Sequence, residues 1–159
     1  MVVLVFLGEI IKIPKTYREE EITEMLCKKI LKKKNLDDQF VNIIDMQKTE
    51  NSILVGYVIG NTEQIKSPGY LIFKRDKEKY ILNKNQSLMS ERGFEIYTSI
   101  FSEPLDNGVI DYLVILNMNE ALKEIVITDD ENDKKVWQIH KIPCMCVVKY
   151  PKNGCYLLL

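Results

Sequence analysis

The residue types that could support chemistry gather toward the C-terminal end of the chain. The single histidine and three of the four cysteines lie there: His140, Cys144, Cys146 and Cys155. Zinc takes four nitrogen or sulfur ligands in a tetrahedral arrangement, and a Cys-x-Cys pair on a strand presents both thiols on one face. Structural zinc sites usually space their cysteines more widely, and Pro143 separates the histidine from the pair. We treat these four residues as candidate metal ligands, and we expect no bound metal and no cofactor.

A histidine and a cysteine could also act together in nucleophilic catalysis. That chemistry needs a thiolate of depressed pKa and a third group that orients the histidine. The sequence indicates neither, so we expect no catalytic residue and a protein that is not an enzyme. On one strand face, the Cα atoms of Cys144 and Cys146 would lie about 6.5 to 7 Å apart, at or beyond the usual disulfide limit. We expect small, buried thiols.

A second group of candidate residues is aromatic and could line a binding groove. Its members are Tyr97, Phe101, Tyr112 and Trp137. Aromatic side chains in apolar strands more often belong to the core. The acidic run at 129–133 has the composition of a calcium loop but lacks the glycine and the terminal glutamate of one, so it predicts a solvated hairpin tip. Beyond the aromatic set, the sequence defines no binding residue.

Length and charge limit the remaining possibilities. A chain of 159 residues can form one domain with a sizeable core. Its 22 basic and 23 acidic residues give a formal net charge of −1. This near-neutral balance gives the protein no overall electrostatic attraction for a polyanion. We therefore expect no nucleic-acid partner.

The first thirteen residues are treated separately from the domain at 14–159. Val2–Leu7 is an uninterrupted apolar run, and Glu9 follows it. A membrane-spanning helix needs about 20 apolar residues, so this run is too short to cross a bilayer alone. It lacks the basic start and the small-residue cleavage site of a secretory leader. Two interpretations stay open: residues 1–13 are the remnant of a leader or membrane anchor, or they form a buried first strand.

A helix is predicted directly after this segment. Thr16 and Glu19 have the spacing of a capping box, and lysines accumulate toward residue 34. These signals predict a helix over 17–33. Its apolar stripe consists of Ile22, Met25, Leu26 and Ile30. A stripe of this kind covers one face of a sheet.

The rest of the chain alternates short apolar runs with turn signals. The runs predict strands at 40–46, 53–59, 70–75, 79–82, 94–101, 110–116, 124–128, 136–142, 145–150 and 156–159. The fold class expected is α+β, with an N-terminal helix packed on a mostly antiparallel sheet of about ten short strands, closed as a sandwich or half-barrel. The polar stretch at 83–92 is a possible seam within the single domain.

Several of these strands carry a resemblance to a known group of proteins. The segments concerned are Gly69–Asp76, Lys79–Leu82, Asp111–Asn117, Leu122–Ile127, Val136–Trp137 and Tyr150–Gly154. With them, the chain resembles small uncharacterised exported or membrane-anchored proteins of Gram-positive bacteria. The resemblance covers most of the chain and includes no catalytic motif. It implies a location outside the cytoplasm, with a tether through the N-terminus, and a β-rich architecture.

Three hypotheses about function follow. The first is a noncatalytic exported or membrane-tethered domain that binds a protein, a peptide or an envelope component through a sheet face or an exposed edge strand. The second is a cytoplasmic accessory or interaction protein, which would keep the cysteines reduced. The third is a small-molecule-binding domain or enzyme with a pocket between helix and sheet. The sequence leaves the oligomeric state open.

Overall fold

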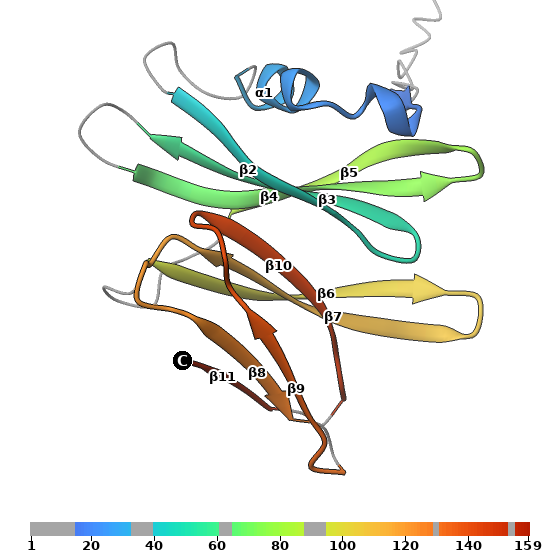
Figure 1. Cartoon of the computed structure of the whole chain (residues 1–159). Helices are drawn as coiled ribbons and strands as arrows, with labels where there is room; N and C mark the ends of the chain where they lie inside the picture. Colours follow the sequence, from blue (N-terminus) through green and yellow to red (C-terminus); the bar gives the residue numbers. More distant parts are fainter. Residues whose placement is uncertain (1–14, 33–39, 61–64, 88–94, 129–130, 153–154) are drawn as a thin grey trace, which may run out of the picture.

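The computed structural model describes residues 15–32, 40–60, 65–87, 95–128, 131–152 and 155–159 (Figure 1). The predictions on residues 1–13 lie outside these ranges, as does most of the predicted seam at 83–92. The elements, in chain order, are β1 (Thr16–Tyr17), a 3₁₀ turn (Glu19–Glu21), α1 (Glu24–Lys32), β2 (Phe40–Lys48), β3 (Ser52–Gly60), β4 (Ile65–Asp76), β5 (Lys79–Ser87), β6 (Ile96–Leu105), β7 (Gly108–Asn117), β8 (Glu124–Thr128), β9 (Lys134–Gln138), β10 (Cys144–Tyr150) and β11 (Cys155–Leu158).

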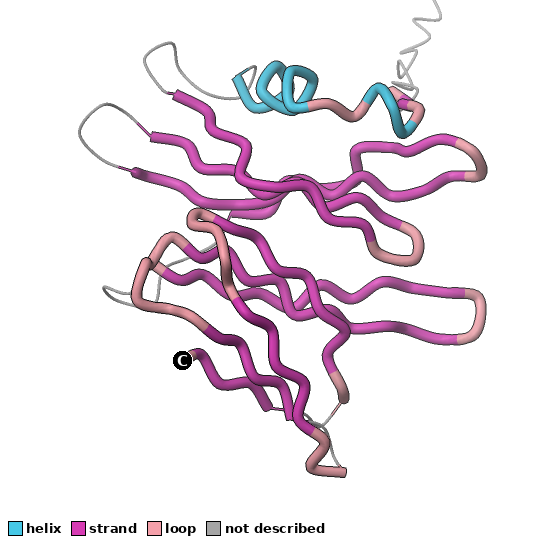
Figure 2. Tube along the Cα trace, in the orientation of Figure 1, coloured by secondary structure: helices cyan, strands magenta, loops and turns pink. Residues whose placement is uncertain are grey.

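The strands divide among three sheets, and every pairing is antiparallel. Sheet A has the order β1-β5-β4-β3-β2, sheet B the order β10-β7-β6, and sheet C the order β11-β8-β9. Hairpins join neighbours such as β4 and β5 or β6 and β7 (Figure 2). One edge strand of sheet B and one of sheet C pair with strands that are distant in the sequence. Strand β10 pairs with β7, and β11 pairs with β8.

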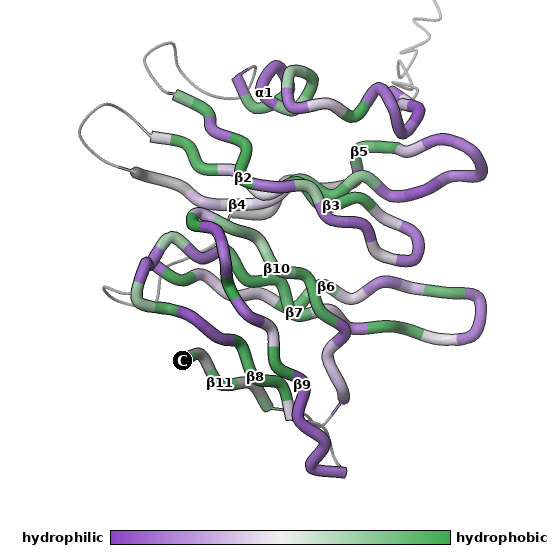
Figure 3. Tube along the Cα trace, in the orientation of Figure 1, coloured by the Kyte–Doolittle hydropathy of each residue, from purple (hydrophilic) through white to green (hydrophobic). Residues whose placement is uncertain are grey.

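The layers stack in the order α1, sheet A, sheet B, sheet C (Figure 1). Three apolar clusters fill the three interfaces. The first joins Cys27 and Leu31 of α1 to sheet A. The second lies between sheets A and B and the third between sheets B and C. Apolar residues run along the strands, whereas the tips of the hairpins are hydrophilic (Figure 3).

Two strands are buried on both faces. Every residue of β3 is buried, and so is the stretch of β7 from Tyr112 to Asn117. Side chains alternate between the faces of a strand, so each of these strands supplies residues to two interfaces. Burial on both faces requires apolar residues at consecutive positions. This is why both strands read as unbroken apolar runs.

Gly56 marks the closest approach of sheets A and B. A Cβ atom placed there would lie 2.8 Å from Cδ2 of Leu116 and 2.9 Å from Sδ of Met145. Both distances are shorter than carbon and sulfur atoms tolerate, so any larger residue would force the ends of these two side chains to shift, and glycine lets them reach the surface of β3. The contact joins β3 to both β7 and β10.

The helix differs from its prediction. Thr16 belongs to β1, and α1 begins only at Glu24, where the hydroxyl of Thr23 accepts a hydrogen bond from the amide of Leu26 at 3.3 Å. Cys27 and Leu31 are fully buried, whereas Met25 is 80% exposed. Ile22, Leu26 and Ile30 of the predicted stripe pack against the first cluster, as expected. Met25 does not, because residues two positions apart in a helix are separated by about 200° and Met25 therefore lies on the side opposite Cys27.

The prediction of an α+β fold dominated by antiparallel strands is confirmed. The prediction of one sandwich or half-barrel is corrected, because the strands form three stacked sheets rather than one closed sheet. The helix also follows a strand, β1, instead of preceding all of them. None of the helices in the described ranges has the length and apolar character that spanning a bilayer requires.

The helix contact gives a direct stability prediction. Leu31→Ala removes a fully buried side chain between α1 and sheet A, and we expect it to lower the free energy of unfolding by about 2 to 5 kcal/mol. Met25→Ala, on the exposed side of the same helix, should change it by less than about 0.5 kcal/mol. Urea unfolding measures both. Equal effects of the two substitutions would contradict this account of the helix face.

Candidate functional site

The four candidate metal ligands occupy three separate places. His140 lies in the exposed loop after β9, Cys155 is exposed at the start of β11, and Cys144 and Cys146 are half-buried on β10. Among the residues that the structure describes, no three His, Cys, Asp or Glu side chains are grouped so that they could hold a metal ion. The structure therefore brings together only the Cys144–Cys146 pair.

The four aromatic candidates fall on the two sides of sheet B. Tyr97 and Phe101 pack into the cluster between sheets A and B, and the ring of Phe101 stacks on that of Tyr112 with centroids 6.2 Å apart. Trp137 packs instead into the cluster between sheets B and C. Three of the four aromatic residues thus lie on the side of sheet B that faces sheet A, and sheet B separates them from Trp137.

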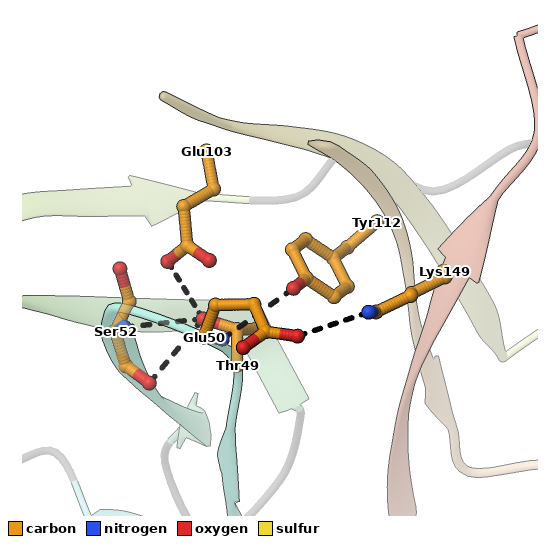
Figure 4. A network of polar contacts seen from close by, with 6 residues as sticks. All are labelled: Thr49, Glu50, Ser52, Glu103, Tyr112 and Lys149. Carbon is orange, nitrogen blue, oxygen red and sulfur yellow. Dashed lines mark hydrogen bonds and ion pairs between the residues drawn. The ribbon is translucent and has the colours of Figure 1, made fainter. Parts of the chain in front are cut away.

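A polar network joins sheets A and B at one end of their interface (Figure 4). Glu103 of β6 is fully buried, and its Oε1 accepts a hydrogen bond from the hydroxyl of Thr49 at 2.7 Å. That hydroxyl oxygen accepts in turn from the amide of Ser52 at 3.1 Å. The second oxygen of Glu103, Oε2, is buried and has no partner among the described residues. The turn between β2 and β3 is therefore held against β6 by a buried carboxyl group.

The same turn also contacts β7 and β10. The amide of Glu50 donates to the hydroxyl of Tyr112 at 3.4 Å, and Nζ of Lys149 donates to Oε1 of Glu50 at 2.9 Å. Burial raises the pKa of Tyr112, and the hydrogen bond to Glu50 raises the pKa of Lys149. The network reaches every strand of sheet B. Its arrangement fixes the position of one sheet on the other.

The sequence analysis missed Glu103, although a signal for it exists. Residues 97, 99, 101 and 103 alternate along one strand, and Tyr97 and Phe101 are apolar members of that face. A carboxylate at the next position of an inward face must be buried or lie at the rim of the sheet. The partner Thr49 is 54 residues away in the chain, and no local pattern connects the two.

The thiol pair on β10 has an unusual electrostatic environment. The pKa of Cys144 is lowered to about 7, chiefly by a hydrogen bond from the thiol of Cys146, with a smaller contribution from the amide of Asn117. The same hydrogen bond, together with burial, raises the pKa of Cys146. The thiol of Cys27 differs, because its burial between α1 and sheet A raises its pKa to about 11. Of these three thiols, Cys144 is the one that is poised to ionise near neutral pH.

The outer face of sheet C carries a row of apolar side chains. Strand register places Leu157 of β11, Val126 of β8 and Val136 of β9 side by side. Leu157 is 57% exposed and Val136 is 52% exposed. Their chain neighbours Ile125, Ile127 and Trp137 point the other way, into the cluster against sheet B. At the opposite end of the stack, α1 covers sheet A, but no element in the described ranges covers this face (Figure 1).

The two edge strands of sheet C differ in charge. Strand β9 contains the exposed Lys134 and Lys135, and lysines of this kind discourage a further strand from pairing. Strand β11 has the sequence Cys-Tyr-Leu-Leu and carries no charge. Among the described residues, no strand pairs with its outer edge.

The helix contributes a hollow on its outer side. It has a volume of about 710 Å³, and the described residues that line it all belong to α1: Glu24, Met25, Lys28, Lys29 and Lys32. It therefore differs from the pocket between helix and sheet that a small-molecule site was expected to use. That interface is filled by Cys27, Leu31 and their partners on sheet A.

No family model, curated protein or solved structure matches this chain.

The buried network gives a second stability prediction. Glu103→Ala should lower the free energy of unfolding by about 1.5 to 3 kcal/mol, because it removes a hydrogen bond to a carboxyl group between two sheets. Glu120→Ala, at an exposed loop position, is the matched control and should change it by less than about 0.5 kcal/mol. Urea denaturation measures both. A Glu103 variant as stable as the control would show that the network does not hold the sheets together.

Proposed function

We propose that this chain is a noncatalytic domain, exported or membrane-tethered, that binds a protein or peptide partner through sheet C. The observation that carries the proposal is the aligned row of Leu157, Val126 and Val136 on a sheet face that no described element covers. A sheet normally buries its apolar face against another layer. Sheets A and B do so on both sides, and sheet C does so only against sheet B.

The partner would bind as an added strand at β11. An extended segment that pairs with a free edge gains main-chain hydrogen bonds, and its alternate side chains reach the face of the sheet. The uncharged β11 favours this edge over β9, where two lysines stand. The segment recognised would thus have apolar residues at every second position, which would extend the row that begins at Leu157.

The location is supported by different residues from the binding surface. The apolar run Val2–Leu7 favours export or a membrane tether. The alternative, an interaction domain of the cytoplasm, is favoured by the four cysteines, which are all free thiols. Fractionation of cells that express the full chain, with and without residues 1–13, separates the two: the tether requires these residues for membrane association.

Peptide display tests the binding proposal. A library of extended peptides is selected on the full chain, and the recovered peptides are measured against a Val136→Lys and Leu157→Lys double variant. We expect affinity to fall at least about tenfold, because Leu157→Lys places a charge beside the apolar side chains of the added strand. Methylation of alternate peptide amides should abolish binding, since it removes the hydrogen bonds to β11.

Met25→Lys is the matched control for this experiment. Met25 is also an exposed apolar residue, but it lies on α1 at the far end of the stack, so the variant should bind the peptides as the wild-type chain does. The proposal is wrong if the selected peptides bind the double variant at full strength. It is equally wrong if Met25→Lys is the change that weakens them.

A further inference from the structure

We propose that Cys144 is a nucleophilic thiol that undergoes reversible exchange with low-molecular-weight disulfides, and that Cys146 and Asn117 position and stabilise its thiolate. This modification site is independent of the binding surface proposed for sheet C. It consists of two residues on β10 and one on the adjacent strand β7.

The strand register places two polar residues beside Cys144. Cys144 and Cys146 occupy alternate positions of β10 and so share a face, and Asn117 of β7 is the direct cross-strand partner of Cys144. Cys146 packs against the cluster between sheets B and C. Cys144 begins the strand and is half-buried, which leaves its sulfur within reach of a small molecule.

Asn117 is the decisive member of the group. Its side chain is fully buried, and its Oδ1 accepts a hydrogen bond from the amide of Asn119 at 2.9 Å. That bond fixes the orientation of the carboxamide. Nδ2 is buried, belongs to the residue opposite Cys144 in the strand register, and has no hydrogen-bond partner in the described part of the chain. A buried N–H donor without an acceptor is costly, and a thiolate at Cys144 would supply the acceptor.

The charges around the pair act in opposite directions. The thiol of Cys146 and the carboxamide of Asn117 lower the pKa of Cys144 to about 7. Burial and the carboxylate of Asp45 on β2 act to raise that pKa. Asp45 is itself fixed by hydrogen bonds from the amide of Met46 and the carboxamide of Gln47, at 2.8 and 2.9 Å. Because the lowering effects win, a large share of Cys144 is thiolate at neutral pH.

The reaction is a thiol–disulfide exchange. The Cys144 thiolate attacks one sulfur of the disulfide, its S–S bond breaks, and the other half leaves as a thiolate that takes a proton from water. Cys144 is oxidised to a mixed disulfide and one half of the reagent is reduced to a thiol. In the mixed disulfide the Cys144 thiolate no longer raises the pKa of Cys146, and burial, with a smaller effect of the Asp45 carboxylate, keeps that pKa above its ordinary value. Same-face strand spacing of about 6.5 to 7 Å is poor for a Cys144–Cys146 bridge. The mixed disulfide is therefore the stable product.

Glutathione disulfide is the probe for this site. The full chain is incubated with it from pH 5.5 to pH 9, and peptide mass spectrometry follows each cysteine. We expect one glutathionyl group on Cys144, formed with a midpoint near pH 7 and removed by dithiothreitol. Cys155, an exposed thiol on another sheet, is the internal control, and it should react more slowly than Cys144 at pH 6.5.

Two variants distinguish this mechanism from simple exposure. Cys146→Ala removes the main donor, so the rate at Cys144 should fall about fivefold at pH 6.5, because the thiolate fraction drops more than nucleophilicity rises. Asp45→Asn removes an opposing charge and should move the midpoint to lower pH. The proposal is overturned if Cys144 reacts no faster than Cys155 at pH 6.5, or if Cys146→Ala, still folded by circular dichroism, leaves the midpoint unchanged.

Discussion

The contact between sheets A and B at Gly56 is the constraint on which the rest of the structure depends. Leu116 and Met145 approach the backbone of β3 so closely that a Cβ atom at Gly56 would push the ends of both side chains aside. This approach buries the second face of β3 and the first face of β7, and β7 in turn supplies the residues that pack against sheet C. Through these two strands the contact links the three apolar clusters of the stack.

The ends of the stack follow from this arrangement and differ from each other. Sheet A is closed by the amphipathic helix α1, whose buried side consists of Cys27 and Leu31. Sheet C has no corresponding cover in the described part of the chain, and it presents an apolar row beside an uncharged edge strand. The binding proposal depends on this asymmetry. The thiol site lies elsewhere, at the start of β10, where Asn117 of β7 is the cross-strand partner of Cys144.

The strands were predictable from the sequence, whereas their distribution among sheets was not. Turn signals mark the hairpins β2 to β5 and β6 to β7, so these local pairings follow from the sequence. The pairing of β10 with β7 and of β11 with β8 is set by packing between distant segments, which leaves no local pattern. The site shows the same division. The inward position of Glu103 can be read from the alternation of β6, but its partner Thr49 cannot.

A double-mutant cycle on Gly56 and Leu116 tests the central claim most directly. Gly56→Ala should lower the free energy of unfolding by about 1 to 3 kcal/mol through overpacking, and Leu116→Ala should lower it by about 2 to 5 kcal/mol. Because the second change makes room for the first, the double variant should be at least about 0.5 kcal/mol more stable than the sum of the two effects implies. Effects that add within about 0.3 kcal/mol would contradict the account, since they would mean that sheets A and B do not meet at Gly56.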